Sequence, residues 1–182
     1  SGIVGVPRCE GMKRHFEIWR DLSRPRFSLL FDLPKIDTEA SRHYLIRKID
    51  SAVRALEKCY GVKIAKRSIG KAVRDANRLR SALRRLDDLR AFQPGTISSR
   101  DFHELVLLSM ESPIDLAIDA VRSAHDRLKK SKGAAQKVIP LAVTGNVVDD
   151  DSLFEAIDES GGSVVFDDLC TGRRFYSTDA PE

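Results

Sequence analysis

The first part of the chain contains two short apolar runs separated by an amphipathic segment. Residues 3–6 form the first apolar run, and residues 27–33 form the second between Pro25 and Pro34. Between the two runs, apolar residues recur every three or four positions over 11–22, which is the period of a helix. The pattern predicts a strand, a helix and a second, buried strand, which together make a β-α-β unit.

After residue 37 the apolar pattern becomes helical and stays so for almost one hundred residues. Thr38 precedes a periodic stretch that ends at Gly61, and these residue types favour the N-cap and the left-handed C-terminal position of a helix. Three more amphipathic segments predict helices over about 68–92, 98–110 and 113–130.

The strand pattern returns near the C-terminus. Residues 138–143 form a continuous apolar run, and residues 163–166 form another directly after two glycines. Between them, Ser152 and Glu155 have the spacing of a capping box, in which each side chain bonds a free backbone N–H at the start of a helix. We therefore expect a second β-α-β unit, with parallel strands because a crossover helix joins them.

The predicted fold class is α/β, with two incomplete β-α-β units of the flavodoxin- or Rossmann-like kind flanking a helical block. We expect residues 1–36 to be the end of a first α/β domain, 37–133 a helical region and 134–182 the start of a second α/β domain. A β-α-β unit packs beside further strands, and the first one begins two residues into the chain. We therefore expect these 182 residues to be the central part of a longer subunit.

The composition excludes several classes of protein. An apolar content of 42%, with 11 Gly and 7 Pro, is that of a packed globular protein rather than a disordered or fibrous one. No apolar run approaches the roughly 20 residues that span a bilayer, and the first ten residues lack the pattern of a signal peptide. Three cysteines far apart in the chain cannot make a disulfide framework. We expect a cytoplasmic protein without a membrane partner.

Two of the cysteines occupy equivalent places after predicted strands. Cys9 follows the first strand and precedes a helix, and Cys170 follows the last strand. Ligands bind at this edge of open α/β sheets, and a helix N-terminus stabilises a thiolate. Both cysteines are candidate ligands of a soft metal, while the alternative is a small buried packing residue, the interpretation we favour for Cys59.

Other candidates for a site are less specific. Asp149–Asp151 fit either a divalent cation or the cap of the following helix. The four histidines have no ligand spacing and fall on predicted helices, where they are expected to be surface or hydrogen-bonded residues.

The segment around Cys170 has a more specific pattern. Residues 167–176 (Asp-Asp-Leu-Cys-Thr-Gly-Arg-Arg-Phe-Tyr) resemble the signature Asp-Asp-Leu-Cys-Thr-Gly-x-Arg-Tyr-Phe of the 2-hydroxyacyl-CoA dehydratase and benzoyl-CoA reductase family. Residues 9–14 (Cys-Glu-Gly-Met-Lys-Arg) are similar to the family's Cys-Asp-Gly-x-Lys-Lys segment, and residues 77–80 (Asn-Arg-Leu-Arg) resemble its Asn-x-x-Arg element. The order of strands, helices and cysteines agrees with the central part of a D-component-like subunit of 2-hydroxyglutaryl-CoA dehydratase.

This resemblance implies an oxygen-sensitive enzyme of anaerobic metabolism with a [4Fe-4S] cluster held by three cysteines between two α/β domains. Cys9 and Cys170 match two of these ligands, and the third would lie before residue 1. Thr171 and Gly172 are candidate donors of hydrogen bonds to the cluster. The implied partners are an acyl-CoA thioester, a related second dehydratase-type subunit and an ATP-dependent iron-sulfur activator. The implied reaction is radical dehydration or reduction of a CoA thioester by one-electron transfer, and no catalytic residue is assigned.

Basic residues are concentrated in the helical block. The formal net charge is only +4, but residues 63–90 hold ten basic side chains against three aspartates. Arginines such as Arg78 and Arg80 are candidates to hold the phosphates of a CoA thioester. A nucleic acid or plain solvation of the helix surface would use the same residues. No aromatic residue lies among these arginines, which argues against single-stranded nucleic acid, because its bases stack on aromatic rings.

Two alternatives to the enzyme stay open at this stage. One is a non-catalytic iron-sulfur electron-transfer or assembly subunit with the same fold. The other is a helical binding module that uses the basic residues of 63–90. On either the enzyme or the carrier interpretation, the 182 residues alone are expected to be inactive.

Overall fold

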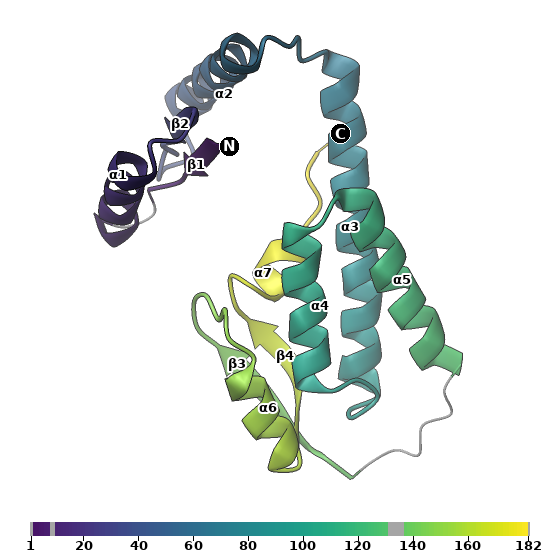
Figure 1. Ribbon diagram of the computed structural model, residues 1–182. Coiled ribbons are helices and arrows are strands. Elements are labelled where there is room, and N and C mark those ends of the chain that lie inside the picture. The colour runs from purple at the N-terminus through teal and green to yellow at the C-terminus, as the bar shows by residue number, and fades with distance from the viewer. Residues whose placement is uncertain (1, 8–9, 131–136, 182) are drawn as a thin grey trace. The chain divides into compact units, whose positions relative to one another are not determined.

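The protein is described by a computed structural model, which covers residues 2–7, 10–130 and 137–181 (Figure 1). By their contacts the residues divide into two compact units, 1–66 and 67–182. Each unit is described by itself.

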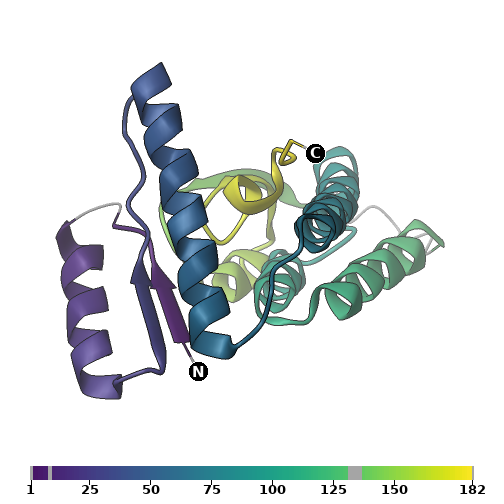
Figure 2. The same cartoon turned by 90° about the horizontal axis from the view of Figure 1, so that it is seen from above.

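The first unit is a β-α-β piece followed by a long helix. Strands β1 (Gly2–Gly5) and β2 (Phe27–Leu30) pair in parallel, and α1 (Glu10–Ser23) connects them. Helix α2 (Glu39–Tyr60) follows. Helices α1 and α2 lie on opposite sides of the two strands (Figure 2). Strand β2 is shorter than the predicted 27–33, because β1, its only strand partner among the described residues, has four residues.

The predicted ends of α2 are confirmed. The Thr38 hydroxyl oxygen accepts a hydrogen bond from the Ser41 N–H at 3.1 Å and so caps the first turn. At the other end, Gly61 has a φ of 67°, a left-handed conformation that glycine adopts without a steric penalty. Its N–H donates to the Glu57 carbonyl oxygen at 2.9 Å, and the Val62 N–H donates to the same oxygen at 3.3 Å.

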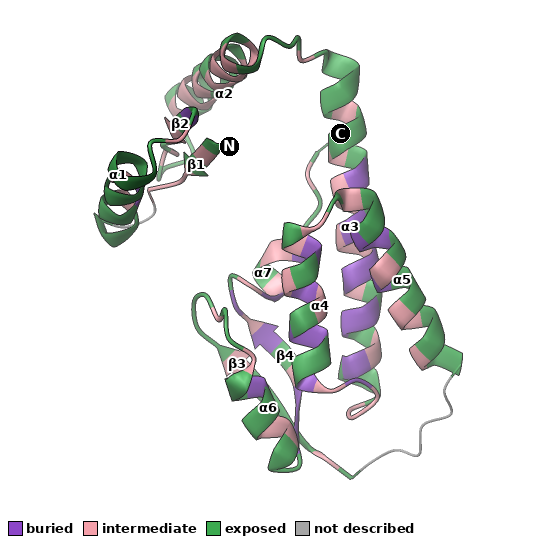
Figure 3. Ribbon diagram, viewed as in Figure 1, coloured by how far each residue is buried: buried purple, intermediate pink, exposed green. Residues whose placement is uncertain are grey.

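The second unit begins with three packed helices, α3 (Lys66–Phe92), α4 (Ser99–Glu111) and α5 (Ile114–Lys130). The apolar positions predicted on their inner faces form one core, visible in Figure 3 as the buried parts of these helices. The buried members of this core on the three helices are Leu79, Ala82, Leu83, Leu86, Phe102, Val106, Ala117, Ile118 and Val121.

The second unit ends in the predicted β-α-β piece. Strands β3 (Ile139–Thr144) and β4 (Gly162–Asp168) pair in parallel and are joined by α6 (Ser152–Glu159). A short helix, α7 (Arg173–Tyr176), follows β4. Most of β4 is buried, whereas β3 is almost entirely exposed, because β4 is its only strand neighbour in the described part of the chain.

The capping box predicted at the start of α6 is wrong. Ser152 is the first residue of the helix rather than its cap, and the Asp150 carboxylate accepts a hydrogen bond from the Ser152 N–H at 2.6 Å. Hydrogen bonds from the Ser152 side chain and backbone hold the pKa of Asp150 below its usual value. The Glu155 carboxylate pairs with Arg100 at 3.1 Å instead of bonding back to the helix start. The Asp150 carboxylate, and not the Ser152 hydroxyl, thus accepts a backbone hydrogen bond at the start of α6.

The predicted fold class is confirmed. The chain is α/β, with one parallel two-stranded sheet before and one after a series of helices. The domain boundaries predicted at 36/37 and 133/134 stay a prediction, although α2 belongs by its contacts to the first compact unit. Among the described residues, no helix is both long and apolar enough to cross a bilayer.

The helical core makes a prediction about stability. Leu83 is fully buried, so Leu83→Ala should lower the free energy of unfolding by about 2–5 kcal/mol, because the cavity it leaves closes only in part. Leu116 on α5 is 63% exposed and is the matched control, and Leu116→Ala should change that free energy by about 0.5 kcal/mol or less. Urea denaturation followed by far-UV circular dichroism measures both, and equal losses would contradict the assignment of the core.

Candidate functional site

Cys170 lies in the turn that follows β4. Residues 169–172 form this turn and connect β4 to α7. Leu169 is buried against Phe154 and Val164, whereas Cys170 is exposed. The buried leucine anchors the turn, and its neighbour presents a free thiol at the C-terminal end of a parallel strand, the edge where α/β proteins bind ligands.

The loop between β3 and α6 supports this turn. The Cys170 N–H donates to the Asn146 carbonyl oxygen at 2.9 Å. The Thr171 hydroxyl donates to the Val148 carbonyl oxygen at 2.7 Å and accepts from the Val148 N–H at 3.0 Å. The Gly172 N–H donates within the turn. Both groups predicted to serve a cofactor, Thr171 and Gly172, thus hold the turn itself together, and their contact with a cofactor stays a prediction.

A charged pair lies next to the Cys170 sulfur. The Arg174 guanidinium binds Asp168 through two hydrogen bonds, of 2.7 Å from Nε and 2.6 Å from Nη2. Its third nitrogen, Nη1, lies 3.7 Å from the Cys170 Sγ. Hydrogen bonding to Asp168 raises the pKa of Arg174, and the same bonds hold the pKa of Asp168 below its usual value. The Arg174 guanidinium, whose charge Asp168 balances, therefore offers the Cys170 sulfur a hydrogen-bond donor.

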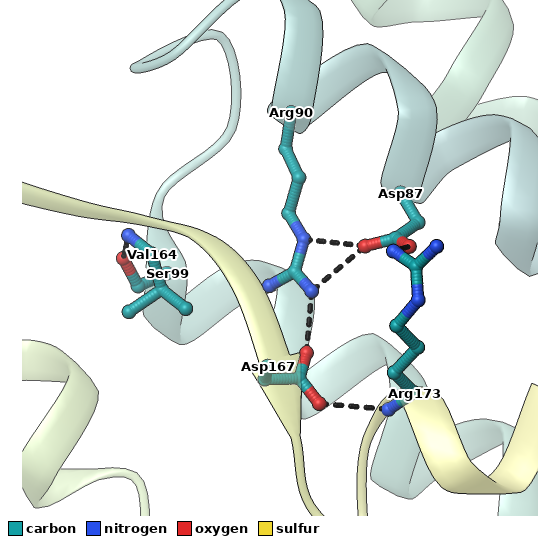
Figure 4. A network of polar contacts seen from close by, with 6 residues as sticks. All are labelled: Asp87, Arg90, Ser99, Val164, Asp167 and Arg173. Atoms are coloured by element: carbon teal, nitrogen blue, oxygen red, sulfur yellow. Dashed lines mark hydrogen bonds and ion pairs between the residues drawn. The ribbon is translucent and has the colours of Figure 1, made fainter. Parts of the chain in front are cut away.

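Behind the turn, four charged residues form a network, shown in Figure 4, in which Asp87, Arg90 and Asp167 are buried and Arg173 is half-buried. We call Asp87, Arg90, Asp167 and Arg173 the buried ion network. Arg90 donates from Nε to Asp87 at 2.8 Å and from Nη2 to Asp167. Arg173 donates from Nη1 to the other oxygen of Asp87 at 2.5 Å and from its backbone N–H to Asp167 at 2.7 Å. The network connects α3 to both sides of the Cys170 turn.

The two aspartates neutralise charge that would otherwise be costly to bury. The Arg90 side chain is 2% exposed, and its guanidinium lies 3.7 Å from the centre of the Phe102 ring. Burial alone would lower the pKa of Arg90, but the charges of Asp87 and Asp167 raise it above its usual value. Burial also raises the pKa of the Tyr176 hydroxyl beside the network, so this group is neutral at physiological pH. The network is therefore a balanced set of charges and not a free site.

Gly172 is required by the close approach of this network. A Cβ atom at position 172 would overlap the Asp167 carboxylate, which occupies that space and accepts a hydrogen bond from the Arg173 N–H. The glycine of the signature segment therefore has a steric reason to be there.

Further along α3, polar side chains hold the segment that follows α7. Asn77 accepts from the Ala180 N–H at 2.9 Å and donates to its carbonyl oxygen at 2.8 Å. Arg84 donates to the Tyr176 carbonyl oxygen at 2.8 Å and to both oxygens of Asp179 at 2.9 Å. Together with the buried ion network, these contacts lay residues 167–180 antiparallel along one face of α3. The Asn-x-x-Arg element thus begins with a residue that fixes the end of the Cys170 segment.

His103 is buried and bonded within the protein, so its contacts indicate a structural role. It is 3% exposed and stacks on Phe154, with ring centres 4.3 Å apart. Its Nδ1 lies 2.8 Å from Asp151 and its Nε2 lies 3.1 Å from the Val148 carbonyl oxygen. The histidine therefore holds the same loop that supports Thr171. Asp151 pairs with His103 and Asp150 bonds the start of α6, so both have partners within the protein.

The remaining predicted residues are in different places. Cys9 lies outside the described residues. The Cys59 thiol contacts the Arg26 carbonyl oxygen at 3.5 Å, in agreement with a packing role. Arg78 is exposed and 3.6 Å from Asp75, and Arg80 donates to Asn77 at 3.0 Å. Among the described residues, no three His, Cys, Asp or Glu side chains are grouped as metal ligands.

The role of Arg90 was not foreseen from sequence, where it counted as part of a basic surface. The one local signal is the spacing of Asp87 and Arg90, three residues apart on a helix, which allows a pair. The second partner of Arg90, Asp167, is 77 residues away from it, and only the fold brings the two together.

The buried ion network predicts an unequal response to the removal of two arginines. Arg90→Met should lower the free energy of unfolding by about 3–5 kcal/mol, because it leaves the buried Asp167 without a side-chain counter-charge and Asp87 with Arg173 alone. Arg100→Met removes the exposed pair with Glu155 and should cost about 1 kcal/mol or less. Denaturant unfolding of both variants measures the difference, and similar small losses would show that the network is not a unit.

A family model described as 2-hydroxyglutaryl-CoA dehydratase, D-component, matches residues 1–182, the whole chain. A comparison with curated proteins finds no match. The matched region includes both β-α-β pieces, helix α3 and the Cys170 turn. The chain therefore belongs to the 2-hydroxyglutaryl-CoA dehydratase D-component family.

Proposed function

We propose that the chain forms part of an iron-sulfur subunit of a 2-hydroxyacyl-CoA dehydratase or benzoyl-CoA reductase-type enzyme. The observation that carries this proposal is the exposed Cys170 thiol with Arg174 at 3.7 Å, in a turn held by Asn146 and Val148. A cysteine that only packs in the core needs neither an exposed thiol nor a guanidinium beside its sulfur. Membership of the D-component family agrees with this assignment.

The residues of the turn fit a [4Fe-4S] cluster as one part of its binding site. Thiolates are the usual ligands of such clusters, and Cys170 offers one with a hydrogen-bond donor beside it. In the proposal, Cys9 supplies a second thiolate, and a third cysteine comes from outside the 182 residues. When bound, the cluster would supply one electron at a time to the acyl-CoA thioester.

The surrounding side chains have separate tasks in this proposal. The Arg174–Asp168 pair orients the Cys170 sulfur and donates to it, which tunes a cluster through hydrogen bonding and charge. Thr171 holds the turn to the loop at Val148 and Gly172 bonds within the turn, and both are proposed to border the cluster. Arg78 and Arg80 are proposed contacts to the phosphates of the CoA thioester.

The proposed partners follow from the same assignment. They are an acyl-CoA thioester, a related second dehydratase-type subunit and an ATP-dependent iron-sulfur activator. We place the enzyme in the cytoplasm, where the free thiols of Cys59 and Cys170 stay reduced.

Anaerobic iron and sulfide analysis of the full-length protein tests the proposal. Cys170→Ala and Cys9→Ala should each lose most of the iron, because each removes one ligand of the cluster. Cys59→Ala is the matched control and should keep it, since the Cys59 thiol contacts a backbone carbonyl oxygen in the first unit.

Iron contents that are unchanged in Cys9→Ala and Cys170→Ala would contradict the cluster assignment. Loss of iron without turnover of any acyl-CoA in the assembled, activated protein would instead identify a non-catalytic electron carrier.

A further inference from the structure

Helices α3 and α5 enclose a groove of about 690 Å³ that is separate from the Cys170 turn in its residues. Arg74, Arg78 and Arg85 line it from α3, and Arg122 and Lys129 line it from α5. We call these five side chains the basic groove. They are exposed, and among the described residues Asp126 supplies the only carboxylate that lines the groove.

Helical spacing explains how the two sets of basic residues face each other. Arg74, Arg78 and Arg85 are four and seven residues apart, so they follow one side of α3. Arg122 and Lys129 are seven residues apart and follow one side of α5 in the same way. Between the arginines of α3, the small residues Ser81 and Ala82 leave the middle of the groove open.

The arginines of α3 differ in whether they have partners. Arg84 and Arg90 bind carboxylates, and Arg80 binds an amide oxygen. In contrast, Arg74, Arg85, Arg122 and Lys129 make no hydrogen bond or ion pair with any of the described residues. Arg78 has only a long contact of 3.6 Å with Asp75, whose other oxygen binds Lys71. Pairing within the fold therefore does not account for the basic groove.

Unpaired arginines facing each other across a groove repel one another. An arginine cannot relieve this repulsion by losing its proton at physiological pH. An anion with several charges does relieve it, and a phosphate accepts paired hydrogen bonds from a guanidinium. The eleven-residue separation of Arg74 and Arg85 corresponds to about 16 Å along α3, more than one phosphate group occupies. The spacing fits a ligand whose phosphate groups are set apart.

The form of the groove favours a small molecule over a macromolecule. Its volume falls within the range of about 300–1,000 Å³ typical of small-ligand sites. No Phe, Tyr or Trp of the described residues lines it, so bases of a single-stranded nucleic acid would find no ring to stack on. Solvated helix surfaces commonly carry basic residues too, but of the residues that the structure describes only Asp126 places a negative charge in this concave site.

We propose that the basic groove between α3 and α5 binds a small organic polyphosphate of the nucleotide kind. The site requires neither Cys9 nor Cys170. For a CoA thioester the inference deepens the proposed function, in which Arg78 already contacts the phosphates, and for a free nucleotide it goes beyond that function. The same phosphate chemistry is present in a CoA thioester and in a free nucleotide. Only the first of these sources rests on the proposed function.

Calorimetric titration of the whole chain at low and at physiological salt tests this inference. The probes are adenosine 3′,5′-bisphosphate, which represents the phosphates of a CoA nucleotide end, and ADP, which represents a free nucleotide. Both should bind, and added salt should weaken the binding because the contacts are charged and exposed. Tighter binding of the bisphosphate would identify a CoA thioester as the source, and equal or tighter binding of ADP would identify a free nucleotide.

Two variants with controls locate the binding. Arg85→Gln combined with Arg122→Gln should weaken binding roughly tenfold or more, since each removes a charged hydrogen-bond donor from the groove. Arg127→Gln, on the same helix as Arg122 but not lining the groove, should leave the affinity nearly unchanged. Circular dichroism of all variants should be that of the unchanged fold, because these side chains bond none of the residues that the structure describes.

Several results would overturn the inference. One is no binding of either probe at millimolar concentration, and another is an equal loss of affinity in Arg127→Gln. Binding of an oligonucleotide or an acidic peptide without binding of either small probe would also overturn it. The iron content of Cys170→Ala is independent of all these outcomes, so a failure here is distinguishable from a failure of the cluster assignment.

Discussion

The position of the Cys170 turn depends on the neutralisation of charge between α3 and β4. Arg90 is buried in the helical unit, and its charge is tolerated because Asp87 and Asp167 accept its hydrogen bonds from two different elements. Asp167 in turn accepts from the Arg173 N–H, which fixes the path of the chain through the turn. A change in any one partner would leave an uncompensated charge in the interior, so the four residues are best understood as one interaction.

Helix α3 carries two sets of arginines, which differ in whether they bind other parts of the fold. One set, with Asn77, holds residues 167–180 along the helix. The other set faces α5, and its one contact with a described residue is the long one of 3.6 Å between Arg78 and Asp75. The concentration of basic residues in 63–90 therefore has two physical causes, of which the first stabilises the site loop and the second leaves charge available to a ligand. The net charge of this segment, counted from the sequence, does not distinguish the paired arginines from the unpaired ones.

Much of the fold was predictable because local chemistry decides it. Thr38 and Gly61 mark the ends of α2, and the apolar runs at 3–6 and 163–166 mark strands. The Cys170 segment was found through a specific resemblance, and its position after a parallel strand is as expected. The capping box failed because Asp150 competes with Ser152 for the first turn of α6.

What the sequence did not show are interactions between distant residues. The burial of Arg90 depends on Asp167, and the role of His103 depends on the carbonyl oxygen of Val148, 45 residues further along the chain. A basic or aromatic residue in a periodic helix has the same local pattern whether it faces solvent or a buried partner. Only the packing of α4 against the β3–α6 region distinguishes the two cases for His103.

A double-mutant cycle between Arg90 and Asp167 tests the central claim most directly. The free energies of unfolding of Arg90→Met, Asp167→Asn and the double variant are compared with that of the unaltered protein. If the two residues act as one interaction across α3 and β4, the double variant should be less destabilised than the sum of the single ones, with a coupling of about 1–3 kcal/mol. Additive losses, within about 0.5 kcal/mol, would contradict the account.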